Sequence, residues 1–168
     1  MLRLRFPRSK LKALAARYPA AVDVPVFAVA EAARRRGYLT KREFMTLGDW
    51  KTPRSRPHRA ANAEAVVREA TRLALGASSI EIKIGILRCL EGVAWPTASV
   101  ILHLCDRAPF PILDVRALWS AGLNGPPRYT TKLWVEYVAF TRALARSAGC
   151  SMRDVDRALW QYSKETQG

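Results

Sequence analysis

The stretch that decides the fold is LRCLEGVAWPTASVILHL, residues 87–104. It begins on an apolar helical face, is interrupted by Gly92, Val93 and Ala94, and resumes at Pro96 as an apolar segment. Glycine is favoured just past the end of a helix and proline in the first turn of one. The pattern therefore predicts a helix-hairpin-helix. Its second helix, apolar almost all round, is expected to be central in the fold.

Helix boundary signals surround this hairpin. Thr40 with Glu43, and Ser78 with Glu81, have the spacing of capping boxes. Further predicted helices run from Ser9 to Tyr18, Asp23 to Gly37, Asn62 to Gly76, Asp114 to Gly122, Thr130 to Ser147 and Ser151 onward. The segment TPRSRPHR, residues 52–59, is predicted to be a basic loop because prolines punctuate it. We expect a compact all-α fold, with 1–168 as a single helical domain or as two small lobes sharing one core.

The charge is strongly asymmetric along the chain. Lysine and arginine total 28 against 14 acidic residues, which gives +14, and residues 1–59 hold fifteen basic and four acidic residues, or +11. Such an imbalance favours a polyanionic partner, with an ordinary solvated basic surface as the alternative. We therefore treat residues 1–59 as a basic N-terminal segment of the domain.

Other classes of protein fit the composition less well. The three cysteines are too few and too scattered for a disulfide framework or an iron–sulfur cluster. No apolar run approaches the roughly 20 residues of a membrane span, and the basic N-terminus is not followed by the apolar core of a secretion signal. The sequence predicts a cytoplasmic protein with no membrane partner.

The hairpin has a chemistry of its own. A short turn that contains glycine lets backbone amides approach a phosphate without obstruction, and the N-terminus of the second helix adds a favourable dipole. The predicted contacts to the DNA backbone are Gly92, Val93, Ala94, Trp95 and Thr97. An ordinary tight turn between two helices is the alternative.

Twenty-two residues after Gly92 the chain reads PILDVRALW, which places Asp114 at the start of a helix. Here the chain resembles the helix-hairpin-helix superfamily of base-excision DNA glycosylases. In that family a catalytic aspartate heading a helix follows the hairpin at about this distance. The resemblance covers 78–122 and extends loosely over 40–165. The stretches DWKTPR and DRALWQYSK also look like those of small bacterial proteins with the 8-oxoguanine glycosylase fold.

The resemblance implies which reaction the protein catalyses and which related reaction it does not catalyse. Family members that also cleave the strand carry a lysine early in the second hairpin helix, where this chain has Trp95, Pro96 and Thr97. It therefore implies a monofunctional glycosylase without lyase activity, with Asp114 as the catalytic carboxylate. The usual second glycine of the hairpin is Ala94 here, which weakens the expected phosphate grip. No cofactor is implied, apart from a monovalent cation at the hairpin.

The chemistry expected of Asp114 follows from the reaction. Breaking an N-glycosidic bond places positive charge on the sugar, and a nearby carboxylate stabilises that charge and activates water. The alternative is that Asp114 only caps its helix, which is worth about 1 kcal/mol.

The basic segment before the hairpin supplies the remaining candidates. Phosphate contacts are predicted for Lys51, Arg54, Arg56 and Arg59. Trp50 and His58 are candidates for a pocket that holds an extruded base, since base-flipping enzymes stack the base on aromatic side chains. Packing within the core is the alternative for Trp50. The sequence thus predicts a DNA glycosylase acting on duplex DNA, with a non-catalytic DNA-binding module or an RNA-binding accessory protein as alternatives.

Overall fold

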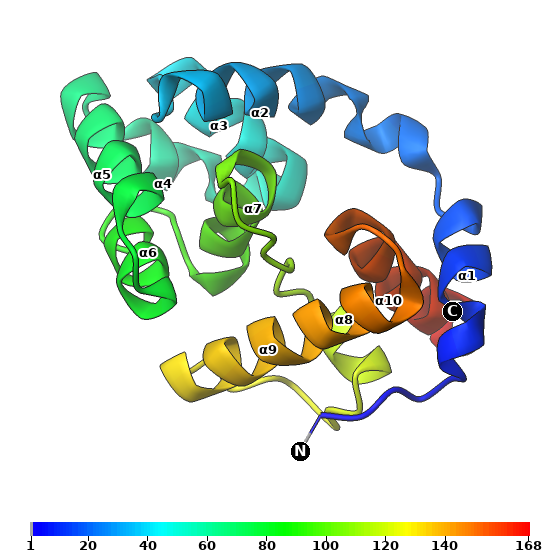
Figure 1. Cartoon of the computed structure of the whole chain (residues 1–168). Helices are drawn as coiled ribbons and strands as arrows, with labels where there is room; N and C mark the ends of the chain where they lie inside the picture. The colour runs from blue at the N-terminus through cyan, green and yellow to red at the C-terminus, as the bar shows by residue number, and fades with distance from the viewer. Residues whose placement is uncertain (1) are drawn as a thin grey trace. The chain divides into compact units, whose positions relative to one another are not determined.

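The computed structural model describes residues 2–168, and all regular secondary structure in that range is helical (Figure 1). The all-α prediction is therefore confirmed. The chain forms two compact units. We call residues 20–108 the hairpin unit and residues 2–19 with 109–168 the terminal unit.

The hairpin unit contains six α-helices and two short 3-10 helices. They are η2 (Ala20–Asp23), α2 (Val24–Arg36), α3 (Lys41–Lys51), η3 (Pro53–Ser55), α4 (Arg56–Ala60), α5 (Glu64–Gly76), α6 (Ile80–Leu87) and α7 (Trp95–Cys105). The central helix is α7, because it packs on α2, α3 and α6. Every residue from Thr97 to Leu102 is buried, as its nearly continuous apolar sequence predicts.

Local capping chemistry sets several of these boundaries. The Thr40 hydroxyl accepts a hydrogen bond from the Glu43 amide, and the Glu43 carboxylate accepts one from the Thr40 amide, so the predicted capping box is confirmed. Gly37 ends α2 with a φ of 85°, which favours glycine. At α6 the capping residue is Ser79 rather than the predicted Ser78.

The terminal unit is built from the two ends of the chain. Its elements are η1 (Arg8–Lys10), α1 (Leu11–Arg17), α8 (Val115–Ser120), α9 (Thr131–Ala148) and α10 (Met152–Gln167). Helix α1 packs along α10 through Leu11 and Leu14, both buried (Figure 1). A bidentate ion pair between Arg17 and Glu165 closes this contact and lowers the pKa of Glu165 to about 2.

The division into units cuts across the basic N-terminal segment. Residues 2–19 belong with the C-terminal helices and residues 20–59 with the hairpin. The chain leaves the hairpin unit between Ala108 and Pro109. The stretch 78–122 therefore contributes its hairpin to one unit and the helix headed by Asp114 to the other.

Candidate nucleic-acid interface

The turn between α6 and α7 needs its glycine for two reasons. Gly92 has a φ of 73°, in the left-handed region where a side chain is strained. A Cβ atom at this position would also lie 2.8 Å from the backbone nitrogen of Arg59 and 3.0 Å from the Cβ of His58. The hairpin turn is therefore packed directly against α4.

Asn62 fastens the same turn from the C-terminal side of α4. Its side-chain oxygen accepts a hydrogen bond from the Glu91 amide at 2.9 Å, and its side-chain nitrogen donates to the Glu91 carbonyl at 3.0 Å. The sequence predicts that the next helix begins at Asn62 with this residue as its cap, and that is wrong, since Ala63 is the N-cap and Asn62 is buried. This amide bridge brings the two predicted halves of the interface, the hairpin and residues 52–59, together.

The segment 52–59 is not the predicted loop. It forms η3 and α4, with Pro53 and Pro57 in their first turns, where a missing amide proton has no cost. The side chains of Arg54, Arg56 and His58 are exposed on this segment. Arg56 also forms an ion pair with Asp49. The contact of Gly92 with α4 thus places exposed basic residues beside the hairpin.

Arg59 differs from its neighbours, and its predicted phosphate contact is wrong. Its side chain is fully buried, where the guanidinium donates to the Asp49 carboxylate at 2.8 Å and to the Thr52 carbonyl at 3.1 Å. Burial, with the neighbouring charge of Arg56, lowers the pKa of Arg59. Gly48 makes room for it, because a Cβ there would lie 2.2 Å from the Arg59 Nε. Arg59 belongs to the core of the hairpin unit.

In the first turn of α7, backbone groups rather than side chains are available to bind a ligand. Its N-cap residue, Ala94, is exposed and makes no side-chain capping bond. Because Pro96 has no amide proton, the free donors of this turn are the amides of Trp95 and Thr97, which can bind an anion. Val93, Trp95 and Thr97 are buried, so the predicted side-chain contact of Trp95 with DNA is wrong. The Arg88 guanidinium lies 4.1 Å from the centre of the Trp95 ring.

Trp50 and Lys51 lie at the end of α3, and both are half-buried. The Trp50 indole nitrogen donates to the Val22 carbonyl at 2.9 Å, which ties α3 to the segment before α2. This contact favours the packing alternative for Trp50 over the predicted base pocket. His58 instead lies beside the hairpin turn, through its contact with Gly92.

Asp114 heads α8 in the terminal unit, as predicted. Its Oδ1 accepts a hydrogen bond from the Arg116 amide at 2.9 Å, and the side chain is half-buried. Burial, and then the charge of Asp114, raise the pKa of Tyr129. Tyr137 is fully buried in the same unit, and its hydroxyl has no hydrogen-bond partner among residues 2–168. Asp114 also contributes to the raised pKa of Tyr137, after burial and Asp156.

The expected monovalent cation at the hairpin would need several backbone carbonyl oxygens from the turn. The carbonyls of Leu87 and Leu90 accept hydrogen bonds from the Leu90 and Val93 amides, and that of Glu91 accepts from Asn62. Three carbonyls of the turn are therefore already hydrogen-bond acceptors, and the monovalent cation stays a prediction. Within residues 2–168, no group of three or more histidine, cysteine or acidic side chains is placed to hold a metal.

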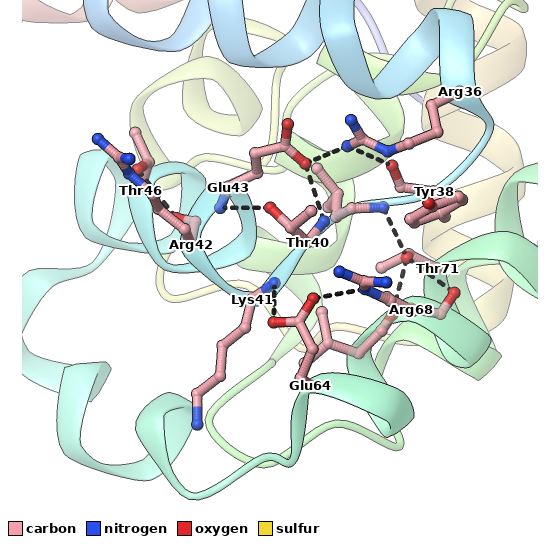
Figure 2. A network of polar contacts seen from close by, with 12 residues as sticks. Arg36, Tyr38, Thr40, Lys41, Arg42, Glu43, Thr46, Glu64, Arg68 and Thr71 are labelled. Atoms are coloured by element: carbon pink, nitrogen blue, oxygen red, sulfur yellow. Dashed lines mark hydrogen bonds and ion pairs between the residues drawn. The ribbon is translucent and has the colours of Figure 1, made fainter.

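Two basic features, a single residue and a cluster, were not singled out from the sequence. One is Arg88, exposed at the end of α6. The other is the group around Tyr38, whose ring centre lies 4.7 Å from the Arg36 guanidinium and 5.7 Å from that of Arg68 (Figure 2). The Arg72 guanidinium lies 4.6 Å from the same ring centre. Arg36 also donates to the Tyr38 carbonyl. A run of three arginines before Gly37 and Tyr38 was the available signal.

Comparison of the chain with protein-family models, curated proteins and solved structures gives no match. Among the described residues, no single helix is long and apolar enough to cross a membrane, although the bent pair Arg8–Arg17 and Ala20–Arg36 passes that test by length and composition.

Proposed function

We propose that the protein binds duplex DNA through its phosphate backbone, with the N-terminus of α7 as the principal contact. The observation that carries this proposal is the exposed Ala94, which leaves the first turn of an eleven-residue helix without a side-chain acceptor. A phosphate oxygen is the natural partner for amides in this position. Phosphate contacts of this kind position a protein on DNA without reading its sequence.

The charges around this helix end support the proposal. Arg88 is exposed on one side of the turn, and Arg54, Arg56 and His58 are exposed on the segment that packs against Gly92. The hairpin unit as a whole has fourteen basic and nine acidic residues, and the rest of the chain has fourteen and five. Both units are therefore positively charged, as the electrostatic term of DNA binding requires.

The first expected result concerns salt. Each phosphate neutralised by a lysine or arginine releases condensed counterions, so affinity falls as salt rises. We expect the logarithm of the association constant for duplex DNA to fall with the logarithm of salt concentration with a slope of about −3 or steeper between about 50 and 200 mM. Fluorescence anisotropy with a labelled duplex measures the slope. A slope near zero contradicts the proposal.

The second expected result concerns Ala94→Asp. An aspartate at an N-cap accepts hydrogen bonds from the first-turn amides and stabilises the helix by about 0.5–2 kcal/mol. The same carboxylate occupies the proposed phosphate position and repels DNA. We therefore expect Ala94→Asp to raise the midpoint of thermal unfolding while weakening duplex binding by about tenfold or more, the size of one charge-assisted contact.

A matched control exists in the same unit. Ala63 is the exposed N-cap of α5 and, like Ala94, makes no side-chain capping bond. Ala63→Asp brings the same charge and the same capping group to a helix with no proposed phosphate, so it should stabilise the fold and leave most of the DNA affinity. Equal losses of affinity in the two variants would mean that only net charge matters and that α7 is no special contact.

Hydrolysis of an N-glycosidic bond is the second candidate function. The observation that favours it is the position of Asp114, a half-buried carboxylate at a helix start whose charge acts on two tyrosines, Tyr129 and Tyr137. A carboxylate held in place is what stabilisation of a cationic sugar requires. The pairing of Asp114 with the Arg116 amide is also what a plain helix cap shows, so the two roles must be separated by activity.

A further inference from the structure

A second basic feature of the hairpin unit lies at the opposite end of α7 from the hairpin turn. It is a pocket of about 370 Å³, which we call the arginine pocket. Its walls come from the ends of α2 and α5 and from the residues at the end of α7. Four arginines line it: Arg34, Arg36, Arg72 and Arg107. Its size falls within the range of small-molecule sites.

The charge inside the arginine pocket is only partly balanced by the protein, since Arg36 is paired with Glu43, which lies outside the lining. Asp106 is the single acidic residue in the lining. Its carboxylate is already paired with the buried Lys83 ammonium at 2.6 Å. The carbonyl ends of α2 and α5 offset some of the positive charge, since a helix C-terminus carries a partial negative charge. The guanidiniums of Arg34, Arg72 and Arg107, which have no ion-pair partner within residues 2–168, still repel one another, and a bound anion reduces that repulsion.

The hydrogen-bond donors of the pocket are only partly used. Arg34 donates to the Leu104 carbonyl, and Arg36 is bound to Glu43 and to the Tyr38 carbonyl. Arg72 and Arg107 form no hydrogen bond or ion pair with any other residue in 2–168. A guanidinium has five donors in a planar fork that matches phosphate oxygens. The pocket therefore has unspent donors of the kind that bind phosphate.

Tyr38 holds two of these arginines in place. The guanidiniums of Arg36 and Arg72 lie 4.7 and 4.6 Å from the centre of its ring, and both line the pocket. The Tyr38 backbone is fixed in turn, because the neighbouring Leu39 amide donates to the buried Thr71 hydroxyl at 2.9 Å (Figure 2). Arginines held on an aromatic ring lose less side-chain freedom when an anion binds.

We propose that the arginine pocket binds the phosphate monoester of a nucleotide. A monoester brings three terminal oxygens and close to two negative charges, which the unspent donors of Arg72 and Arg107 can share. The volume leaves room for the attached sugar. The nucleotide is either free or the phosphorylated end of a strand, which share this chemistry. The inference rests on the pocket alone and does not depend on the hairpin binding DNA.

The test compares ligands with and without the phosphate. Isothermal titration calorimetry is performed with deoxyadenosine 5′-monophosphate, with deoxyadenosine and with inorganic phosphate. A single-stranded oligonucleotide with a 5′-phosphate and the same oligonucleotide with a 5′-hydroxyl are each tested as competitors of the bound monophosphate. We expect the monophosphate to bind and deoxyadenosine not to bind. A preference for the phosphorylated oligonucleotide identifies a strand end as the ligand, and binding of the monophosphate without that preference identifies a free nucleotide.

The variants are Arg72→Gln and Arg107→Gln, both at exposed positions where the fold is expected to survive. Each should weaken monophosphate binding by about tenfold or more, because each removes a charged donor. The control is Arg35→Gln, which loses the same charge between Arg34 and Arg36 but does not line the pocket. Circular dichroism checks the fold of each variant.

Two results would overturn this inference. One is that neither the monophosphate nor the phosphorylated end binds more tightly than its phosphate-free counterpart. The other is that Arg35→Gln loses as much affinity as the two pocket variants, which would reduce the effect to net charge. Loss of duplex binding in Ala94→Asp with the monophosphate still bound would separate this site from the hairpin.

Discussion

Replacing Lys83 with methionine is expected to lower the free energy of unfolding of the hairpin unit by about 3–5 kcal/mol. The side chains of Lys83 and Asp106 are only 7% and 5% exposed, and their charged atoms are 2.6 Å apart. Lys83 also donates to the Leu75 carbonyl at 2.8 Å, near the end of α5. Methionine keeps the length of the side chain but leaves the Asp106 carboxylate buried without its cation. Urea unfolding followed by circular dichroism measures the change.

Two further variants make this prediction specific. The double variant Lys83→Met/Asp106→Asn removes both charges and retains an acceptor for the Ala108 amide, which now donates to Asp106 at 2.9 Å. It should recover much of the loss, since most of the cost of breaking a buried pair comes from the charge left behind. Lys132→Met, at an exposed position, should change stability by less than about 0.5 kcal/mol. If Lys83→Met is no less stable than Lys132→Met, the structural role of Lys83 is contradicted.

Features that depend on a few adjacent residues were predictable from the sequence. The capping box at Thr40, the helix start at Ser151 and the glycine that ends α2 appear as expected, because each is decided within about one helical turn. The burial of α7 also followed, since an apolar surface all round a helix requires contacts on every side. Local features of this kind predict where most of the helices lie and where the turn between α6 and α7 occurs.

Features that depend on distant residues were not predictable. Asn62 looks like a helix cap in sequence, but Glu91, twenty-nine residues away, uses both ends of its amide. Arg59 looks like a surface cation in a proline-rich segment, yet it is buried against Asp49 and Gly48. The one local indication that Arg59 is buried is Gly48 inside α3, because the Arg59 side chain occupies the space that a larger residue there would need. The packing of α1 on α10 is equally remote in sequence.

The candidate site shows the same division. The sequence identified the hairpin and the basic segment 52–59 separately, and their contact came only from the packing of Gly92 on α4. Treating arginines as a total charge also concealed their different roles, because Arg59 is structural, Arg88 lies on Trp95, and Arg72 faces an open pocket. Net charge predicts a polyanionic partner. The position of each guanidinium decides which arginines can contact that partner.

The second large effect is expected at Asp114. If this carboxylate stabilises a cationic sugar, Asp114→Asn should slow base release by about 10²–10³-fold, by analogy with the loss of one preorganised oxyanion-hole donor. The fold should lose little, because asparagine and aspartate cap helices about equally well and the amide oxygen can still accept from Arg116. Duplex affinity should stay the same or improve slightly, since a negative charge is removed. The assay is single-turnover base release from DNA with oxidised, alkylated, deaminated and other modified bases, detected by alkali cleavage.

The control for Asp114→Asn is Asp154→Asn, which removes a carboxylate from the first turn of α10 in the same unit. Because Asp154 belongs to a capping box with no proposed chemistry, its variant should release bases at the wild-type rate and change only the thermal stability. A plain capping role for Asp114 gives the same outcome for both variants. If the wild type releases no base from any substrate, the protein does not hydrolyse the N-glycosidic bonds of the bases tested. The salt dependence and the Ala94→Asp variant then still decide whether it binds DNA. If a base is released and Asp114→Asn is as fast as the wild type, the reaction is real and another group provides the charge. The three outcomes separate binding, catalysis and the identity of the carboxylate.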